Sequence, residues 1–423
     1  MSTRTRRPSP PRAGEVTLRL LLRERPFLLY LIGQTASGAG SALSSVALVF
    51  AVQGISPSAA AVGLVLLAAR LPGIVLTLAG GLVADRCSRR RVMLAADAAR
   101  TALQAGTGCL LLSGHATVLG LAALQFLAGG ASAIFTPAAT ALLTAIAPRG
   151  QVRRAGSLLG ITTAVAQTGG LAVSGVLVAI AGAGTSFLID AATFAASSAS
   201  LALIRTAAVP SPKPGGVLRD LAEGWRAVTS RRWLVVYSLH VTALNVLVLS
   251  PFFVLGPVIA HDRLGGAPAW SAIALGYVLG NLLAAQITYH WAPRRPILAA
   301  LGLSIALVPL LALLGLGAPL WLIVPAAVLA GAQGTIYNTL ATSARQSNLP
   351  SATLGRASAI TSIGSTALVP VGMGLAGVLA DAVGSPAVLL CGSLLVLCLA
   401  AICISLPSTR TALALDLPRR APG

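Results

Sequence analysis

Gly81-Leu-Val-Ala-Asp-Arg-Cys-Ser-Arg-Arg-Arg91 is a charged stretch that closes one long apolar run and precedes another. The two runs cover about residues 59–83 and 92–112. A helix needs about 20 consecutive apolar residues to cross a bilayer core about 30 Å thick, so each run is long enough to span a membrane. The stretch therefore predicts a polar turn between two transmembrane helices.

The composition places the whole chain in the membrane class. Of its 423 residues 56% are hydrophobic and only 9% are charged, and the mean hydropathy is +0.86. Soluble domains carry roughly a quarter charged residues, so a soluble enzyme, a disordered chain and a nucleic-acid-binding module all fit poorly. The five cysteines lie in apolar runs or beside arginines and suggest neither a disulfide framework nor a metal site.

Twelve apolar stretches of spanning length can be marked along the chain. They are continuously apolar, whereas a membrane barrel shows short alternating strands, so we predict helices. The predicted spans cover about residues 27–52, 59–83, 92–112, 117–139, 157–180, 186–204, 234–259, 270–290, 297–316, 319–342, 358–380 and 386–406.

The basic residues lie on one side of these spans. The net charge is +20, from 30 Lys and Arg against 10 Asp and Glu. With the N-terminus inside, the loops on the other side contain only Arg263 as a basic residue. This bias predicts a multi-pass plasma-membrane protein with both termini in the cytoplasm. The arginines would then contact anionic lipid headgroups rather than nucleic acid.

An internal repeat divides the chain into two halves. A shift of 202 residues superposes Pro148 on Pro350, Arg154 on Arg356, Gly170 on Gly372, Gly175 on Gly377 and Gly182 on Gly384 without a gap. We therefore predict an all-α membrane protein with twelve transmembrane helices in two pseudo-symmetric six-helix bundles. The predicted parts are a disordered cytoplasmic tail (1–26), an N-terminal bundle (27–204), a cytoplasmic central loop (205–232), a C-terminal bundle (233–406) and a cytoplasmic tail (407–423).

The charged stretch quoted above resembles the Gly-x-Leu-Ala-Asp-Arg-x-Gly-Arg-Arg loop of the major facilitator superfamily, with Ser88 in place of the second glycine. In that family the loop forms a cytoplasmic latch between the two halves. The resemblance carries this role to Gly81, Asp85, Arg86, Arg89 and Arg90. Asp97 and Arg100 follow at spacing i, i+3, where they can pair, and complete the predicted latch motif. The alternative is a simple basic stop-transfer loop.

Further stretches resemble the drug-efflux branch of this family, which holds macrolide and siderophore exporters. They are Ala133-Ile-Phe-Thr-Pro-Ala138, Pro148 to Leu158 and Gln346-Ser-Asn-Leu-Pro350. That branch often has an aspartate after the glycine of span one, where this chain has Ser41, and an arginine where it has Thr140. The resemblance implies proton-coupled antiport.

Ionisable groups inside a membrane are costly and therefore mark candidate functional positions. Arg70 near the middle of span two is a cavity residue that meets an anionic group, or a structural or snorkelling side chain. Asp190 and His240 are candidates for proton coupling, with a structural role as the alternative for each. Other polar residues at buried depth line a pathway or join helices. With Arg70, the candidate cavity residues are Gln34, Asn245, Gln333, Tyr337 and Asn338.

The glycines of spans five and eleven are interpreted as packing positions, because a missing side chain lets helices approach closely. They are Gly169, Gly170, Gly175, Gly372 and Gly377. The sequence has no phosphate-binding loop motif and no zinc-type His/Cys cluster. An ion or solute gradient must therefore supply the energy, and neither an enzyme activity nor a cofactor or metal is expected.

Three functional hypotheses follow from the sequence. The first is an exporter of drug-like or natural-product molecules, working by alternating access of the two halves. The second is an exporter of a specific organic anion such as a siderophore, with Arg70 reading the charge. The third is a membrane-embedded sensor or enzyme on a transporter scaffold. For an exporter we expect a small-molecule substrate, protons and membrane lipids as partners, no nucleic acid, and a monomer.

Overall fold

The computed structural model describes residues 21–79, 89–148, 150–204, 217–291 and 293–406, and over these ranges it is helical with no strand. The apolar runs become long helices because a helix satisfies its own backbone hydrogen bonds where water is absent. In the first half they are α2 (Arg25–Ile55), α3 (Ala59–Ala79), α4 (Arg89–Leu112), α5 (Val118–Ile146) and α6 (Val152–Leu203).

The second half contains shorter pieces, because several spans change their winding part of the way along. They are α7 (Val217–Thr229), α8 (Arg232–Leu244), the π-helical segment η2 (Asn245–Leu249), α9 (Ser250–Arg263), α10 (Ala267–His290), α11 (Pro296–Leu303), the 3₁₀ segment η3 (Ser304–Leu307), α12 (Val308–Gly315), α13 (Leu320–Asn348), α14 (Ser351–Ala367), α15 (Val369–Val383) and α16 (Ser385–Ser405). α9, α12 and α15 each carry a proline in the first turn, where its missing N–H costs no helical bond.

Nine helical stretches of the described chain are long and apolar enough to cross a membrane. One of them, α6, is two helices that meet at Gly182, whose φ is 79°. The shorter apolar helix α3 and the helix α4, which contains Asp97 and Arg100, lie where spans two and three are predicted. With α6 divided and these two added, helices stand at all twelve predicted positions.

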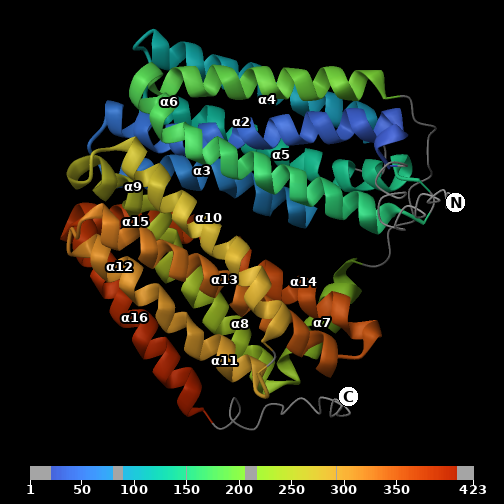
Figure 1. The fold of residues 1–423 in the computed structure, drawn as a ribbon, viewed down its shortest axis with the longest axis vertical. Helices are drawn as coiled ribbons and strands as arrows, with labels where there is room; N and C mark the ends of the chain where they lie inside the picture. Colours follow the sequence, from blue (N-terminus) through green and yellow to red (C-terminus); the bar gives the residue numbers. More distant parts are fainter. Residues whose placement is uncertain (1–20, 80–88, 149, 205–216, 292, 407–423) are drawn as a thin grey trace, which may run out of the picture.

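The helices form two bundles that lie side by side (Figure 1). We call α2 to α6 the N-bundle and α8 to α16 the C-bundle. Contacts between the bundles join α3 to α15, α6 to α10, and α9 to α2 and α3. The bundles converge at the end where Gly182 and Gly384 lie, which we call the joint end. At the opposite end, where α2 begins, their ribbons diverge in Figure 1.

The repeat in the sequence is visible in the packing of the bundles. Gly182 and Gly384, which are 202 residues apart, both have positive φ, at 79° and 89°. A Cβ on Gly175 would come within 2.5 Å of the carbonyl oxygen of Ala267, the first residue of α10. Its counterpart Gly377 would come within 2.4 Å of the carbonyl oxygen of Ala59, the first residue of α3. Equivalent glycines therefore make equivalent contacts across the pseudo-symmetry.

Not every glycine of spans five and eleven is a packing position. Cβ atoms on Gly170 and Gly372 would come within 2.5 and 2.4 Å of carbonyl oxygens of Ala39 and Val246. A Cβ on Gly169 would meet no atom of a neighbouring element within 4 Å. The interpretation of Gly169 as a packing residue is therefore wrong, because this glycine faces away from the contact that Gly170 makes.

The tightest approach between helices joins α10 to α13. A Cβ on Gly331 would lie 1.8 Å from the carbonyl oxygen of Tyr277, and one on Gly280 would lie 1.9 Å from that of Val328. Both positions therefore require the absence of a side chain. We expect Gly331→Ala to force these helices apart and to destabilise the folded protein by about 1–3 kcal/mol.

The control for this prediction is Gly160→Ala, because a Cβ on Gly160 would meet nothing within 4 Å. The midpoint of thermal unfolding in detergent is the measurement. Gly331→Ala should lower it by several degrees while Gly160→Ala leaves it unchanged or raises it. Equal midpoints for the two variants would contradict the close packing of α10 on α13.

The central loop contains a helix that was not predicted. α7 lies against α14, and Glu223 forms an ion pair with Arg356. Gly224 permits this contact, because a Cβ there would come within 2.7 Å of the carbonyl oxygen of Arg356. Trp225 and Arg226 on α7 are exposed.

Candidate functional site

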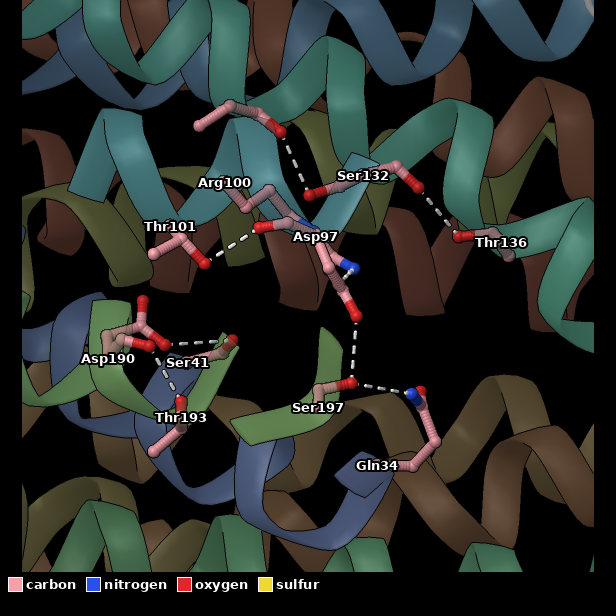
Figure 2. A network of polar contacts seen from close by, with 11 residues as sticks. Gln34, Ser41, Asp97, Arg100, Thr101, Ser132, Thr136, Asp190, Thr193 and Ser197 are labelled. Carbon is pink, nitrogen blue, oxygen red and sulfur yellow. Dashed lines mark hydrogen bonds and ion pairs between the residues drawn. The ribbon is translucent and has the colours of Figure 1, made fainter. Parts of the chain in front are cut away.

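A buried ion pair lies in the interior of the N-bundle (Figure 2). Arg100 and Asp97 pair within α4, and Asp97 is 0% exposed. Ser197 of α6 donates a hydrogen bond of 2.8 Å to the second carboxylate oxygen. The guanidinium carbon of Arg100 lies 4.1 Å from the ring centroid of Phe135 and 4.3 Å from that of Phe194. The guanidinium is therefore held by one carboxylate and two aromatic faces.

A second buried carboxylate belongs to Asp190, which lies two helical turns before Ser197 in α6. Its side chain accepts hydrogen bonds from Ser44 (2.7 Å), Gln104 (2.8 Å) and Ser41 (3.4 Å). These donors come from α2 and α4 and hold the carboxylate where three helices meet. Gly40 allows the approach, because a Cβ there would come within 2.8 Å of a carboxylate oxygen of Asp190.

The charges in this bundle do not balance when both carboxylates are ionised. Asp97, Asp190 and Arg100 then give two negative charges against one positive charge. A buried charge without a counterion is costly, and hydrogen bonds from neutral groups offset only part of that cost. Binding of one proton by a carboxylate would therefore balance the charge in the interior of the N-bundle.

The C-bundle contains a cavity of about 320 Å³. α8, η2, η3, α13 and α14 line it, so it lies entirely within this bundle. Its lining combines aliphatic side chains with amides, hydroxyls, two tyrosines and one arginine. The residues on which the argument below depends are Tyr237, Asn245, Gln333, Tyr337, Asn338, Arg345 and Thr361.

Two tyrosine rings form one wall of the cavity, and a histidine supports one of them from behind. Nδ1 of His240 lies 3.0 Å from the hydroxyl oxygen of Tyr337, and the two rings stack with centroids 5.8 Å apart. Tyr237 stacks on the same ring at 5.6 Å. His240 is buried and its Nε2 has no hydrogen-bond partner among the described residues. It lies behind Tyr337 and is not itself part of the lining.

Arg345 lies at the end of the cavity towards which α13 runs. Its two terminal nitrogens donate to the hydroxyls of Thr361 (3.1 Å) and Thr342 (3.0 Å), and its guanidinium carbon lies 5.6 Å from the ring centroid of Tyr237. Its Nε is buried without a hydrogen-bond partner. No acidic side chain of the described residues forms an ion pair with it.

The structure brings together four of the predicted cavity residues and separates the other two. Asn245, Gln333, Tyr337 and Asn338 all line the C-bundle cavity. Gln34 instead joins the N-bundle network, where its amide lies 3.4 Å from the hydroxyl of Ser197 (Figure 2).

Arg70 is exposed in α3, and the structure describes neither a hydrogen bond nor an ion pair for it. It lies seven residues after Gly63 and three after Leu67, so the three share one face of the helix. Gly63 and Leu67 both contact α15 of the C-bundle. Arg70 therefore lies on the face of α3 that looks towards the C-bundle.

Part of the predicted latch motif falls outside the described residues. This applies to Gly81, Asp85 and Arg86, and to the side chain of Arg89. Arg90 donates to the carbonyl oxygens of Leu201 and Ala202 at the end of α6, where a cation also complements the helix dipole.

The described part of the motif stays within one bundle. Arg90 ties α4 to α6 of the N-bundle, and Asp97 and Arg100 are buried inside that bundle. The ribbons of the two bundles diverge at the end where α4 begins (Figure 1), so the role of these three residues in a latch between the halves stays a prediction.

Sequence reasoning missed several residues of these sites. Gln104 and Ser44 carry no signal of their own and become partners of Asp190 only through folding. Arg345 follows the predicted span 319–342, and one sequence cannot show which way an arginine near the end of a span points. The available hint was the pair of polar residues, Gln333 and Asn338, that precede it in the same span.

Two bundles of membrane-spanning helices, one of which contains a polar and aromatic cavity, are the arrangement of a membrane transporter. A family model described as transmembrane secretion effector matches residues 21–419. The chain therefore belongs to this family of the major facilitator superfamily, as the resemblance of its sequence implied. Family and relatives are transporters, which confirms that this chain is a transporter and not an enzyme.

The similar proteins include efflux pumps over nearly their whole length. The multidrug efflux pump Tap of Mycolicibacterium fortuitum is 29% identical over 409 residues, which cover 91% of this chain and 96% of the pump. Macrolide efflux protein A of Streptococcus pyogenes is 23% identical over 387 residues, covering 88% of this chain and 93% of that protein.

Solved structures with the same fold include other transporters. The nucleoside transporter NupG superposes with a TM-score of 0.72 at 14% identity, covering 90% of this chain and 98% of that chain. A bacterial homologue of the iron transporter ferroportin gives 0.70 at 16% identity, covering 90% and 99%. These likenesses confirm the predicted fold class.

Proposed function

We propose that the protein exports drug-like or natural-product molecules from the cytoplasm, by alternating access and in exchange for protons. The cavity in the C-bundle carries this proposal, because it combines aromatic walls with a few convergent polar groups, as small-molecule sites do. The efflux pumps that the chain resembles over nearly its whole length support the direction of transport.

The joint end faces the outside of the cell in this proposal. The one-sided distribution of arginines supports this orientation, because positive residues favour the cytoplasmic side. Both termini and the central loop then lie in the cytoplasm. Residues 27–204 and 233–406 would move against each other as two bodies around the contacts at the joint end.

The strongest of these contacts is made by Asp381 at the end of α15. Its carboxylate accepts hydrogen bonds from the backbone N–H groups of Ala59 (2.8 Å) and Ala60 (3.3 Å), and from the hydroxyl of Ser58. It therefore caps the first turn of α3 from the other bundle. A carboxylate at a helix N-terminus is favoured by the free N–H groups and by the helix dipole.

A similar five-residue motif, a glycine, two aliphatic residues, an alanine and an aspartate, occurs in both halves of the sequence. It is Gly377-Val-Leu-Ala-Asp381 near the end of α15, and Gly81-Leu-Val-Ala-Asp85 in the sequence that follows α3. The first motif caps α3 in this structure. We infer that Asp85 caps the opposite end of span eleven when the transporter opens outwards, so that each aspartate closes one side.

Asp190 is the proposed proton carrier. It is the acidic group of the N-bundle that has no guanidinium in hydrogen-bond contact, and its neighbours are neutral donors. It also lies against Ser41, the position where the drug-efflux branch often has an aspartate of its own. A carboxylate supplied by α6 would then take the place of one supplied by span one.

Transport into everted membrane vesicles tests the function. An acidic vesicle interior reproduces the outside of the cell, so we expect at least one compound from a panel of differently charged drugs to accumulate inside. A protonophore should remove that accumulation. Vesicles without the protein serve as the blank, and no gradient-dependent accumulation of any compound would refute the proposal.

A cavity-filling variant links transport to the C-bundle cavity. Asn338→Trp should lower the initial rate at least about tenfold, because the indole occupies the space that a bound molecule needs. Thr339→Trp is the matched control, since Thr339 is exposed on the same helix but does not line the cavity. Equal rates for the two variants would place the substrate elsewhere.

A further inference from the structure

The cavity in the C-bundle holds a cation, Arg345, for which the described residues supply no counterion. Arg345 can donate five hydrogen bonds, and its terminal nitrogens use two hydroxyl acceptors. Both acceptors are neutral, and its Nε has no hydrogen-bond partner at all. Tyr237 and the two threonines fix the guanidinium in place without neutralising its charge.

The acidic side chains that the structure describes all lie away from the cavity. Asp97 and Asp190 are buried in the N-bundle, Glu223 pairs with Arg356, and Asp381 caps α3. Glu24 and Asp262 are exposed at the ends of α2 and α9. None of these six lines the cavity. The lining therefore offers one positive charge, several amides and hydroxyls, and no negative charge from the described residues.

A second cation, in the N-bundle, also has no ion-pair partner among the described residues. Arg70 lies on the face of α3 that looks towards the C-bundle, as shown above from the contacts of Gly63 and Leu67. Each bundle thus contains one guanidinium without an acidic partner among the described residues, and that of the N-bundle lies on the side towards the C-bundle. An arginine near the middle of a span is costly, and an anionic group on the transported molecule would offset that cost.

We propose that the transported molecules carry an anionic group, such as a carboxylate, a sulfonate or a phosphate, next to an aromatic or apolar ring system. Arg345 pairs with the anionic group, the ring lies against Tyr237 and Tyr337, and the amides of Asn245, Gln333 and Asn338 bind further acceptors. A cation of the same shape is excluded, because it would meet Arg345 and no carboxylate. This inference rests on the proposed function and narrows its substrate class.

Three dyes that share one ring system can test this charge preference. Fluorescein is an anion, unesterified rhodamine keeps a carboxylate beside a cationic ring, and rhodamine methyl ester is a cation without a carboxylate. Binding to the purified protein, measured by fluorescence anisotropy, should weaken in that order. Arg345→Gln should weaken fluorescein binding at least about tenfold, as expected for the loss of a charge-assisted contact, and change ester binding less than about twofold.

Two further variants distinguish the loss of the charge at Arg345 from a general loss of folding. Arg345→Lys keeps the charge and should retain more fluorescein binding than Arg345→Gln. Arg232→Gln, an exposed arginine at the start of α8 outside the cavity lining, should leave all three affinities unchanged. Tighter binding of the methyl ester than of fluorescein, or an equal loss for all three dyes in Arg345→Gln, would overturn the proposal.

Transport of the same dyes distinguishes this inference from the function on which it rests. Fluorescein binding that depends on Arg345, without gradient-driven movement of any dye or drug, would refute the exporter and keep the anion site. Gradient-driven export with no preference among the three dyes would refute the anion site and keep the exporter. Arg70→Gln should lower fluorescein export while sparing the ester, and an equal loss for both dyes would count against the proposal.

Discussion

Asp190→Asn is expected to abolish proton-driven export while leaving a folded transporter in the membrane. An amide matches the carboxyl group in size and can keep hydrogen bonds to Ser44 and Gln104, but it cannot gain or lose a proton. Accumulation driven by an acidic vesicle interior should fall at least about tenfold, to the level seen without a gradient. Exchange of substrate down its own concentration gradient should continue, because it needs no proton transfer.

The stability of this variant gives a second readout. Asp190 is fully buried with neutral hydrogen-bond partners, and removing an unpaired buried charge is often neutral or stabilising. The thermal midpoint of Asp190→Asn should therefore equal or exceed that of the wild type. Asp262→Asn, which changes an exposed aspartate, is the control for charge alone. Undiminished gradient-driven accumulation in Asp190→Asn would exclude Asp190 as the proton carrier.

Asp381→Asn is expected to weaken the closure of the joint end. The amide can still accept hydrogen bonds, but the change removes the negative charge from the first turn of α3, a contribution of about 0.3–1 kcal/mol. The population open at the joint end should then rise by about two- to fivefold. Asp85→Asn should shift the equilibrium the other way and impair turnover, because the two aspartates are proposed to close opposite sides.

A cysteine at Leu67 can report this shift in a protein whose native cysteines are replaced. Leu67 lies between the bundles, against Gly374 of α15, so a membrane-impermeant thiol reagent added outside reaches it only when the joint end opens. The rate of modification should rise several-fold in Asp381→Asn and fall in Asp85→Asn. Asp262→Asn again controls for lost charge at the same end. An unchanged rate in Asp381→Asn would show that this cap does not hold the bundles together.

The sequence predicted features that depend on local composition. Continuous apolar runs marked every span, since a helix in lipid needs only its own residues to satisfy its backbone. The 202-residue repeat paired Gly182 with Gly384, and in the structure the two glycines occupy equivalent positions with positive φ. Polar residues at buried depth in the second half proved to share one cavity, because a span can bury an amide only where another polar group or a cavity receives it.

Features that depend on distant contacts could not be predicted. The donors to Asp190 come from residues 86 to 149 positions away, and no spacing rule connects them. Asp381 caps a helix that begins 322 residues earlier, so its role emerges only when the two bundles are placed together. Arg90 likewise contacts carbonyl groups at the end of α6, more than 100 residues away in the chain, and no spacing rule predicts that contact.

The glycine joints have a consequence for how such a transporter could be blocked. Gly182 alone separates the two helices of α6, Gly384 alone separates α15 from α16, and the longest connection at this end is residues 113–117. In the proposed orientation, an antibody that approaches from the medium would therefore find no connection longer than five residues to bind. An inhibitor acting from that side would have to be a small molecule that binds between the start of α3 and the end of α15, where Asp381 joins the two bundles.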